Sequence, residues 1–201
     1  MRFLALGDSY TVGDCVAETE SWPVQLVTRL QEQGILISSP EIVATSGWTT
    51  IDLAVGIKAA QLQQPYDLVS LLIGVNNQYQ GRSQEEYQQQ FAHLLQQAIT
   101  LAGNDPARVI VLSIPDWSVT PFAAGLDTAV ITAEIDAFNA INRAETENAG
   151  AHYVDVTAVS RQAAADPGLI AEDGLHPSGK MYTAWVELVL PTVLRTMMHD
   201  A

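Results

Sequence analysis

The sequence predicts a three-layer α/β/α sandwich built around a parallel sheet of about five strands. Short apolar segments of strand length alternate with helix-length segments about five times along the 201 residues. Neighbouring parallel strands need crossover connections, and a parallel sheet is buried on both faces, so this alternation favours helices on both sides of the sheet. The chain contains no internal repeat, low-complexity tract or linker. Residues 1–201 are therefore expected to form a single domain.

Five segments have the composition of buried strands. Each is a mainly apolar run bounded by turn residues, which is typical of a strand in the interior of a sheet. The predicted strands are Phe3 to Leu6, Ile42 to Ala44, Asp67 to Ile73, Arg108 to Ile114 and His152 to Val156.

The segments between these strands carry helix start and stop signals. Ser21 precedes Trp22 and Pro23 as an N-cap precedes a proline in the first turn, and Gly34 closes that helix. Ser83 is expected to cap a second helix, with Glu86 completing a capping box and Gly103 ending the helix. Two further helices are predicted over residues 129–148 and 178–197.

Composition and charge exclude several classes of partner. The formal net charge is -14, with only nine Lys and Arg residues, so the surface repels phosphate backbones and anionic lipid headgroups. The longest apolar runs are far shorter than the roughly 20 residues that span a bilayer. We therefore expect no nucleic-acid partner and no stable membrane association, whereas composition does not indicate the oligomeric state.

Cysteine and histidine usage indicates the compartment and the absence of a metal. Cys15 has no second cysteine with which to pair, and no signal-peptide pattern is visible, so a reducing, cytoplasmic location is predicted. Cys15 has no basic neighbour in sequence and is expected to pack rather than to react. His93, His152 and His199 lack metal-site spacing, so no metal is expected.

One serine directly follows the first strand and could be either a reactive hydroxyl or a cap or turn residue. The chain passes from the apolar run ending at Leu6 into Gly7, Asp8 and Ser9. Such a junction can lift a hydroxyl clear of the sheet edge, although a serine after a strand more commonly serves as a cap or turn residue. It is not the G-x-S-x-G elbow, because Thr11 occupies the position of the second glycine.

A second feature supplies the groups that would activate this serine. Asp173 and His176 are three residues apart in the last loop, so one turn can bring the carboxylate to one ring nitrogen while the other nitrogen faces outward. A capping aspartate and an exposed histidine would be the structural alternative. Together with Ser9, however, the pair would complete a set of nucleophile, base and orienting group.

Two further loops offer hydrogen-bond donors. Asn76 follows the third strand and carries an amide that could stabilise a developing oxyanion. Gly47 follows the second strand and could bring its backbone N–H close to a ligand. Each signal is weak alone, and the simpler interpretation is a turn.

Taken in order, these blocks resemble those of the GDSL, or SGNH, hydrolase family. The matching residues are the Gly-Asp-Ser sequence at 7–9, Gly47, the G-x-N pattern at 74–76 and the D-x-x-H pattern at 173–176. The Trp22-Pro23 pair and Pro177 are similar to those of bacterial lysophospholipase and thioesterase-like members. The resemblance implies a flavodoxin-like fold and hydrolysis of an ester or thioester without a cofactor.

The resemblance also implies roles for individual residues. Ser9 would be the nucleophile, with His176 as base and Asp173 as the group that orients it. The oxyanion hole would consist of the Ser9 and Gly47 backbone N–H groups and the Asn76 side chain. Two positions depart from the family pattern, because Tyr10 stands where many members have leucine and Asn77 stands where many have aspartate.

These departures affect the expected substrate more than the chemistry. Tyr10 and Asn77 are therefore candidate substrate-binding residues, as are three aromatic residues that follow strand-end loops. These are Trp48, Tyr79 and Trp117. The predicted function is a serine ester hydrolase of the carboxylesterase, lysophospholipase or thioesterase type that forms an acyl-enzyme. A carbohydrate O-acetylesterase and a non-catalytic ligand-binding module on the same fold are the alternatives.

Overall fold

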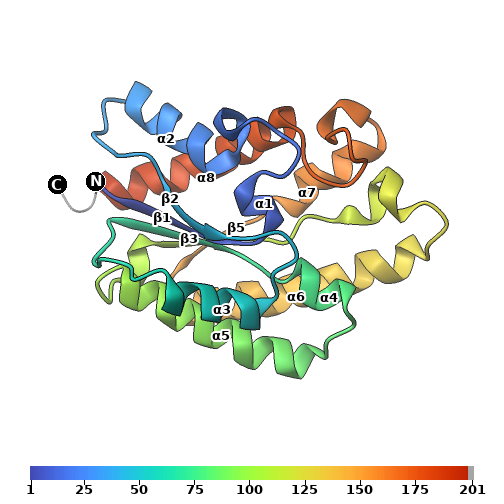
Figure 1. Cartoon of the computed structure of the whole chain (residues 1–201), viewed down its shortest axis with the longest axis horizontal. Coiled ribbons are helices and arrows are strands. Elements are labelled where there is room, and N and C mark those ends of the chain that lie inside the picture. Colours follow the sequence, from blue (N-terminus) through green and yellow to red (C-terminus); the bar gives the residue numbers. More distant parts are fainter. Residues whose placement is uncertain (199–201) are drawn as a thin grey trace.

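Five parallel strands form the centre of the molecule, as predicted. The computed structural model describes residues 1–198, and its sheet has the strand order β2-β1-β3-β4-β5 (Figure 1). The strands are β1 (Phe3–Gly7), β2 (Glu41–Ala44), β3 (Leu68–Leu72), β4 (Val109–Leu112) and β5 (His152–Val154). This is the flavodoxin-like order, in which the chain reverses its direction of winding between β1 and β3. Ligands in such sheets bind beyond the carboxyl ends of the strands at that point.

The last two strands end earlier than the apolar runs suggest. The Ser113 N–H still donates to the Val154 carbonyl of β5 at 3.0 Å, but Ile114 leaves the ladder, and its backbone N–H donates to Asn139 Oδ1 at 2.8 Å. Val156 lies beyond β5, and its N–H donates to Ser113 Oγ at 2.8 Å. Polar side chains thus replace sheet partners at these two ends, which hydrophobicity alone does not reveal.

Helices cover both faces of the sheet. Figure 1 shows α2 (Trp22–Glu32) and α8 (Gly179–Met198) packed together on one face, and three helices on the other. The three are α3 (Thr50–Ala59), α5 (Gln84–Leu101) and α6 (Thr128–Asn148). Three short helices follow strand ends: α1 (Ser9–Val12), α4 (Val75–Tyr79) and α7 (Thr157–Ser160). The predicted three-layer sandwich is confirmed.

The helix start signals are confirmed in part. Ser83 accepts a hydrogen bond from the Glu86 N–H at 3.2 Å, as an N-cap does. The reciprocal half of the predicted capping box is not formed, because the Glu86 carboxylate accepts from Gln90 Nε2 instead. Ser21 occupies the N-cap position of α2, but its hydroxyl donates backwards to the Glu18 carbonyl at 2.9 Å. The proline in the first turn is the signal that holds for α2.

Helix α3 was not predicted as a separate element. Its sequence is mostly apolar and therefore shows almost no amphipathic periodicity. The start of the helix is nevertheless marked, since Asp52 Oδ2 accepts from both the N–H and the hydroxyl of Thr49 at 2.9 and 2.6 Å. The residues before α3 form the loop that reaches the candidate site.

One continuous cluster of buried apolar side chains joins the sheet to both helix layers. Its largest fully buried members include Trp22 and Trp185, which come from α2 and α8. No helix within the described residues is long and apolar enough to cross a membrane. His199, considered above as a metal ligand, lies outside the described residues.

Candidate active site

Ser9 lies at the point where β1 gives way to α1. Glycine is required at position 7 because the chain passes close to β3 there. A Cβ atom at Gly7 would lie 2.5 Å from the Leu72 carbonyl oxygen. Asp8 then caps α1, with Oδ1 accepting the Tyr10 N–H at 3.1 Å. Ser9 is consequently the first residue of the helix, where backbone N–H groups have no partner inside the helix.

Ser9, His176 and Asp173 form one chain of hydrogen bonds. His176 Nε2 lies 2.9 Å from Ser9 Oγ, and His176 Nδ1 lies 2.5 Å from Asp173 Oδ2. An ionised carboxylate can only accept, so Nδ1 carries the ring proton and Nε2 is left to accept from the serine hydroxyl. The structure brings together residues that are 167 positions apart in sequence.

The Asp173 carboxylate is held in its ionised form. Burial acts to raise its pKa, but the hydrogen bond from His176 and the N–H groups of Leu175 and His176 outweigh burial and lower the pKa to about 2. Both backbone N–H groups donate to Asp173 Oδ1 at 3.0 Å. One carboxylate oxygen is thus fixed by the loop and the other by the imidazole.

Asp8 has the opposite environment although it is adjacent to Ser9. The side chain is completely buried, and Oδ2 has no hydrogen-bond partner among the described residues. Burial is the main cause that raises the pKa of this carboxyl, to about 7. The carboxylic acids of Asp8 and Asp173 therefore have very different affinities for protons.

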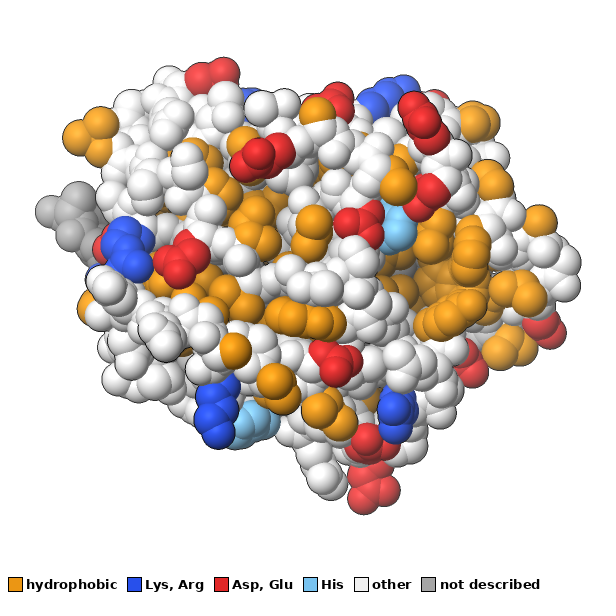
Figure 2. All heavy atoms as spheres, viewed as in Figure 1, with side chains coloured by type: hydrophobic (Ala, Val, Ile, Leu, Met, Phe, Trp, Pro, Cys, Tyr) orange, Lys and Arg blue, Asp and Glu red, His pale blue; other side chains and the backbone are white. Residues whose placement is uncertain are grey.

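A pocket of about 190 Å³ opens at Ser9 and His176. Its lining is mostly apolar, and in Figure 2 a hydrophobic hollow lies beside a histidine that has acidic side chains around it. The remaining lining residues are Tyr10, Asp14, Ser46, Gly47, Val75, Asn76, Tyr79, Trp117, Phe122 and Leu175.

Three aromatic rings form one wall of the pocket. Ring centroids of Tyr79, Trp117 and Phe122 are 5.7 to 6.3 Å apart. Trp117 is buried, and its indole N–H donates to Gln78 Oε1 at 2.9 Å. Tyr79 and Phe122 are 59% and 47% exposed, so they form the rim. Such a wall offers a large apolar surface to a ligand.

Gly47, in the turn after β2, and Asn76, in α4, belong to two segments that are joined by a hydrogen bond. Gly47 has a φ of 82°, and a Cβ atom there would meet nothing within 4 Å, so the glycine serves the backbone conformation rather than close packing. Asn76 Nδ2 donates to the carbonyl of Trp48 at 2.9 Å. The amide keeps a second N–H, and both residues line the pocket.

This geometry can be compared with that of known proteins. The model of the GDSL-like Lipase/Acylhydrolase family matches residues 5–184 of this chain. The chain belongs to this family. Membership makes it an acylhydrolase that acts on ester bonds. No curated protein matches the chain.

Solved structures agree with the GDSL-like fold at low sequence identity. TesA is 22% identical, with a TM-score of 0.75 over 98% of this chain and 99% of that one. Esterase EstA from Pseudoalteromonas sp., in a structure inhibited by monoethylphosphonate, is 16% identical, with a TM-score of 0.75 over 98% of both chains. Axe2-W215I, an acetyl xylan esterase from Geobacillus stearothermophilus, is 21% identical, with a TM-score of 0.72 over 96% and 94%.

Two of the residues expected to bind substrate do not line the pocket of this GDSL-like protein. Asn77 is buried, and its amide exchanges hydrogen bonds with Thr50, accepting from the N–H at 3.0 Å and donating to the hydroxyl at 2.7 Å. The Trp48 ring packs over Gly56 of α3, so only its carbonyl faces Asn76. Both side chains join α3 to the site, which is a structural role.

Tyr10 lines the pocket as expected, whereas Cys15 is placed differently from the prediction. The Tyr10 ring lies edge-on to the His176 ring, with centroids 5.6 Å apart, and limits its movement. Cys15 is exposed rather than packed. Burial and then the nearby carboxylates of Asp173, Asp14 and Glu172 raise the pKa of its thiol. A raised pKa disfavours the thiolate, so Cys15 is a poor nucleophile.

Within residues 1–198, one group of three side chains has metal-ligating atoms close together. Cys15, Asp173 and His176 place such atoms within 4.8 Å of one another. The carboxylate and the imidazole of this group already bond to each other. A metal ion would have to break that bond.

Several pocket residues were not predicted from the sequence. They are Asp14, Ser46, Val75, Phe122 and Leu175. Ser46, Val75 and Leu175 are next to family motif positions and could have been found from that proximity. Asp14 and Phe122 come from segments whose approach to Ser9 depends on tertiary packing.

Proposed function

We propose that this chain is a serine ester hydrolase that works through a Ser-His-Asp triad and a covalent acyl-enzyme. The observation that carries the proposal is the hydrogen-bonded chain from Ser9 Oγ through His176 to Asp173, open to an apolar pocket. The hydrogen bonds suit the roles that the chemistry needs. The pKa of Asp173 is lowered to about 2, its carboxylate faces His176 Nδ1, and His176 Nε2 faces the Ser9 hydroxyl.

Acyl transfer follows from this arrangement. His176 Nε2 takes the hydroxyl proton as Ser9 Oγ attacks the ester carbonyl, and Asp173 stabilises the imidazolium. The imidazolium returns the proton to the departing alcohol, which leaves an acyl group on Ser9. A water molecule then gives a proton to Nε2 and attacks the acyl carbon, and the imidazolium returns the proton to Ser9 Oγ as the acid leaves.

In this mechanism we assign three donors to stabilise the tetrahedral oxyanion. They are the Ser9 N–H at the start of α1, the Gly47 N–H and the second N–H of the Asn76 amide. The bond from Asn76 to the Trp48 carbonyl holds the Gly47 loop against α4. Donors fixed before the reaction need no reorganisation when the charge develops.

Pocket size and composition support a short acyl group. A volume of about 190 Å³ between apolar walls fits a small acyl chain better than a long one. The alternative, a carbohydrate O-acetylesterase, is favoured by the two exposed aromatic rings at the rim, because such rings can stack on a sugar. A non-catalytic binding module would not require the complete hydrogen-bonded triad.

The deciding experiment is hydrolysis of p-nitrophenyl esters from acetate to long acyl chains by wild type and Ser9→Ala. We expect short esters to be preferred and turnover to fall by about 10⁴- to 10⁶-fold in the variant. Circular dichroism should show that the variant remains folded. A folded Ser9→Ala protein with near wild-type turnover would remove Ser9 from the mechanism. A maximum at long chains would contradict the assigned pocket.

A further inference from the structure

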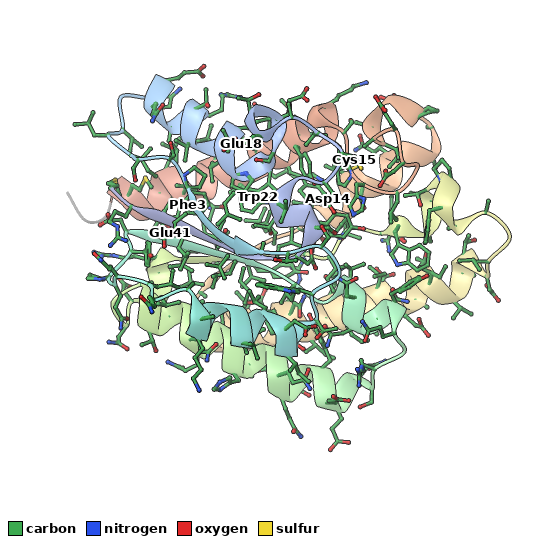
Figure 3. The ribbon with its side chains drawn as sticks, viewed as in Figure 1. Phe3, Asp14, Cys15, Glu18, Trp22 and Glu41 are labelled. Atoms are coloured by element: carbon green, nitrogen blue, oxygen red, sulfur yellow. The ribbon has the colours of Figure 1, made fainter. Side chains whose placement is uncertain are left out.

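Asp14 is a second carboxylate beside the catalytic imidazole. It lies on the turn that follows α1, next to Cys15, as Figure 3 shows. Its Oδ2 atom is 4.0 Å from His176 Nε2, and the side chain is 26% exposed and lines the pocket. The proposed triad uses Asp173 on the other ring nitrogen, so Asp14 has no part in that chemistry.

The position of the Asp14 carboxylate is fixed by a hydrogen bond. The Ser46 hydroxyl donates to the same Oδ2 atom, and Ser46 precedes Gly47 in the loop proposed to stabilise the oxyanion. The charge is therefore held at one place in the pocket. No Lys or Arg is among the residues that line this pocket in the described part of the chain.

If the proposed function holds, the reaction brings the alcohol half of the ester close to the Asp14 carboxylate. His176 Nε2 must protonate the departing alcohol oxygen, which therefore lies about 3 Å from that nitrogen. Since Asp14 Oδ2 is 4.0 Å from the same nitrogen, the carboxylate is at most about 7 Å from that oxygen, within reach of a charge carried a few carbon atoms along the alcohol. The acyl half extends away from Nε2, from the opposite side of the carbonyl carbon.

We propose that Asp14 determines specificity by selecting esters whose alcohol half is positively charged, such as a quaternary ammonium alcohol. A cation beside the alcohol oxygen pairs with Asp14, whereas an anionic group there meets an unpaired carboxylate. The whole-molecule field acts in the same direction, because the formal net charge is -14. The site thus favours amino-alcohol esters over esters with a phosphate near the leaving oxygen.

Two acetate esters of equal shape test this selection. Acetylcholine and neohexyl acetate differ only in the charged nitrogen that replaces a carbon. We expect wild type to have a kcat/KM about five- to tenfold higher for acetylcholine at low ionic strength. In Asp14→Asn the ratio should fall to about one, because asparagine keeps an acceptor for Ser46 but removes the charge. Added salt should lower the wild-type ratio as well.

Two control variants separate charge from structure. Ser46→Ala removes the hydrogen bond and keeps the carboxylate, so it should lower kcat/KM for both esters and retain most of the ratio. Glu85→Gln removes an equal charge from the exposed surface of α5 and should leave the ratio unchanged. A ratio of one in wild type, or the same ratio in wild type and Asp14→Asn, would overturn the proposal.

Binding of the alcohols alone gives a test that does not depend on turnover. Titrations of the folded protein with choline and with neohexyl alcohol, followed by NMR, should show about fivefold tighter binding of choline to wild type. The preference should disappear in Asp14→Asn, and equal affinities in wild type would refute the role of Asp14. Ser9-dependent hydrolysis without any charge preference would refute this inference alone. Choline preference without hydrolysis of any ester would refute the proposed function alone.

Discussion

Asp8 and Asp173 are both close to Ser9, yet their environments are opposite. Asp173 lies in an exposed loop, where an imidazole and two backbone N–H groups hold its pKa at about 2. Asp8 lies in the core, where one backbone N–H is its sole described partner and burial raises its pKa to about 7. Complete burial disfavours a charge on Asp8, whereas three donors outweigh burial at Asp173, so the surroundings of each carboxylate rather than its distance from the nucleophile decide which one supports a charge.

The difference shows how one site can need two kinds of aspartate. A carboxylate that stabilises an imidazolium must stay ionised throughout the cycle, and Asp173 has the hydrogen bonds that ensure this. Asp8 shapes the turn by capping α1, a task that its neutral form also performs through Oδ1. Charge at Asp8 is a cost to the fold, whereas charge at Asp173 is part of the proposed chemistry.

The largest effect is expected from Asp173→Asn. Asparagine preserves the shape but can donate to Nδ1, which favours the wrong imidazole tautomer and leaves Nε2 protonated. We expect kcat on p-nitrophenyl acetate to fall by about 10³- to 10⁴-fold. Asp166→Asn, in another exposed turn, is the matched control and should retain wild-type turnover. A loss of less than tenfold in Asp173→Asn would show that the ionised carboxylate is not needed.

The sheet and the contact between Asp173 and His176 could be predicted from the sequence because each is locally encoded. Apolar runs identify buried strands without knowledge of their neighbours, and the Asp173 to His176 spacing predicts a contact that one turn of chain creates. The pocket was predicted less well. Trp48 and Asn77 are part of the family blocks, but packing against α3 turns their side chains away from the ligand. Asp14 and Phe122 come from loops whose positions only tertiary contacts determine.

A smaller effect, on stability, is expected from Asp8→Asn. The folded pKa of Asp8 is about 7 and the unfolded value is about 3.9, so the unfolded state loses this proton first as pH rises. The native state then binds more protons, and wild-type stability falls between about pH 4 and pH 7. By pH 8 the free energy of unfolding of the wild type is lower by up to about 4 kcal/mol than at pH 4. Asp8→Asn has no carboxyl at this position and should not show this decrease.

Urea unfolding at pH 4.5 and pH 8 measures this difference. The stability of Asp8→Asn relative to wild type should increase with pH, while Glu85→Gln on the surface should show the wild-type pH dependence. Parallel pH profiles for wild type and Asp8→Asn would mean that the buried carboxyl does not titrate in this range.

The smallest effect is the contribution of Asp173 to stability in acid, and its sign is opposite to that of Asp8. The folded pKa of Asp173 is about 2, below the unfolded value of about 3.9, so this stabilisation is present above about pH 4 and is lost as pH falls toward 2. Solvent screens a carboxylate in an exposed loop, so we expect less than about 1 kcal/mol. The stability difference between wild type and Asp173→Asn should therefore shrink from pH 5 to pH 2.5 in urea unfolding. A difference that stays constant, or that grows in acid, would mean that the ionised form of Asp173 does not stabilise the fold. The contrast with Asp8 would then be lost.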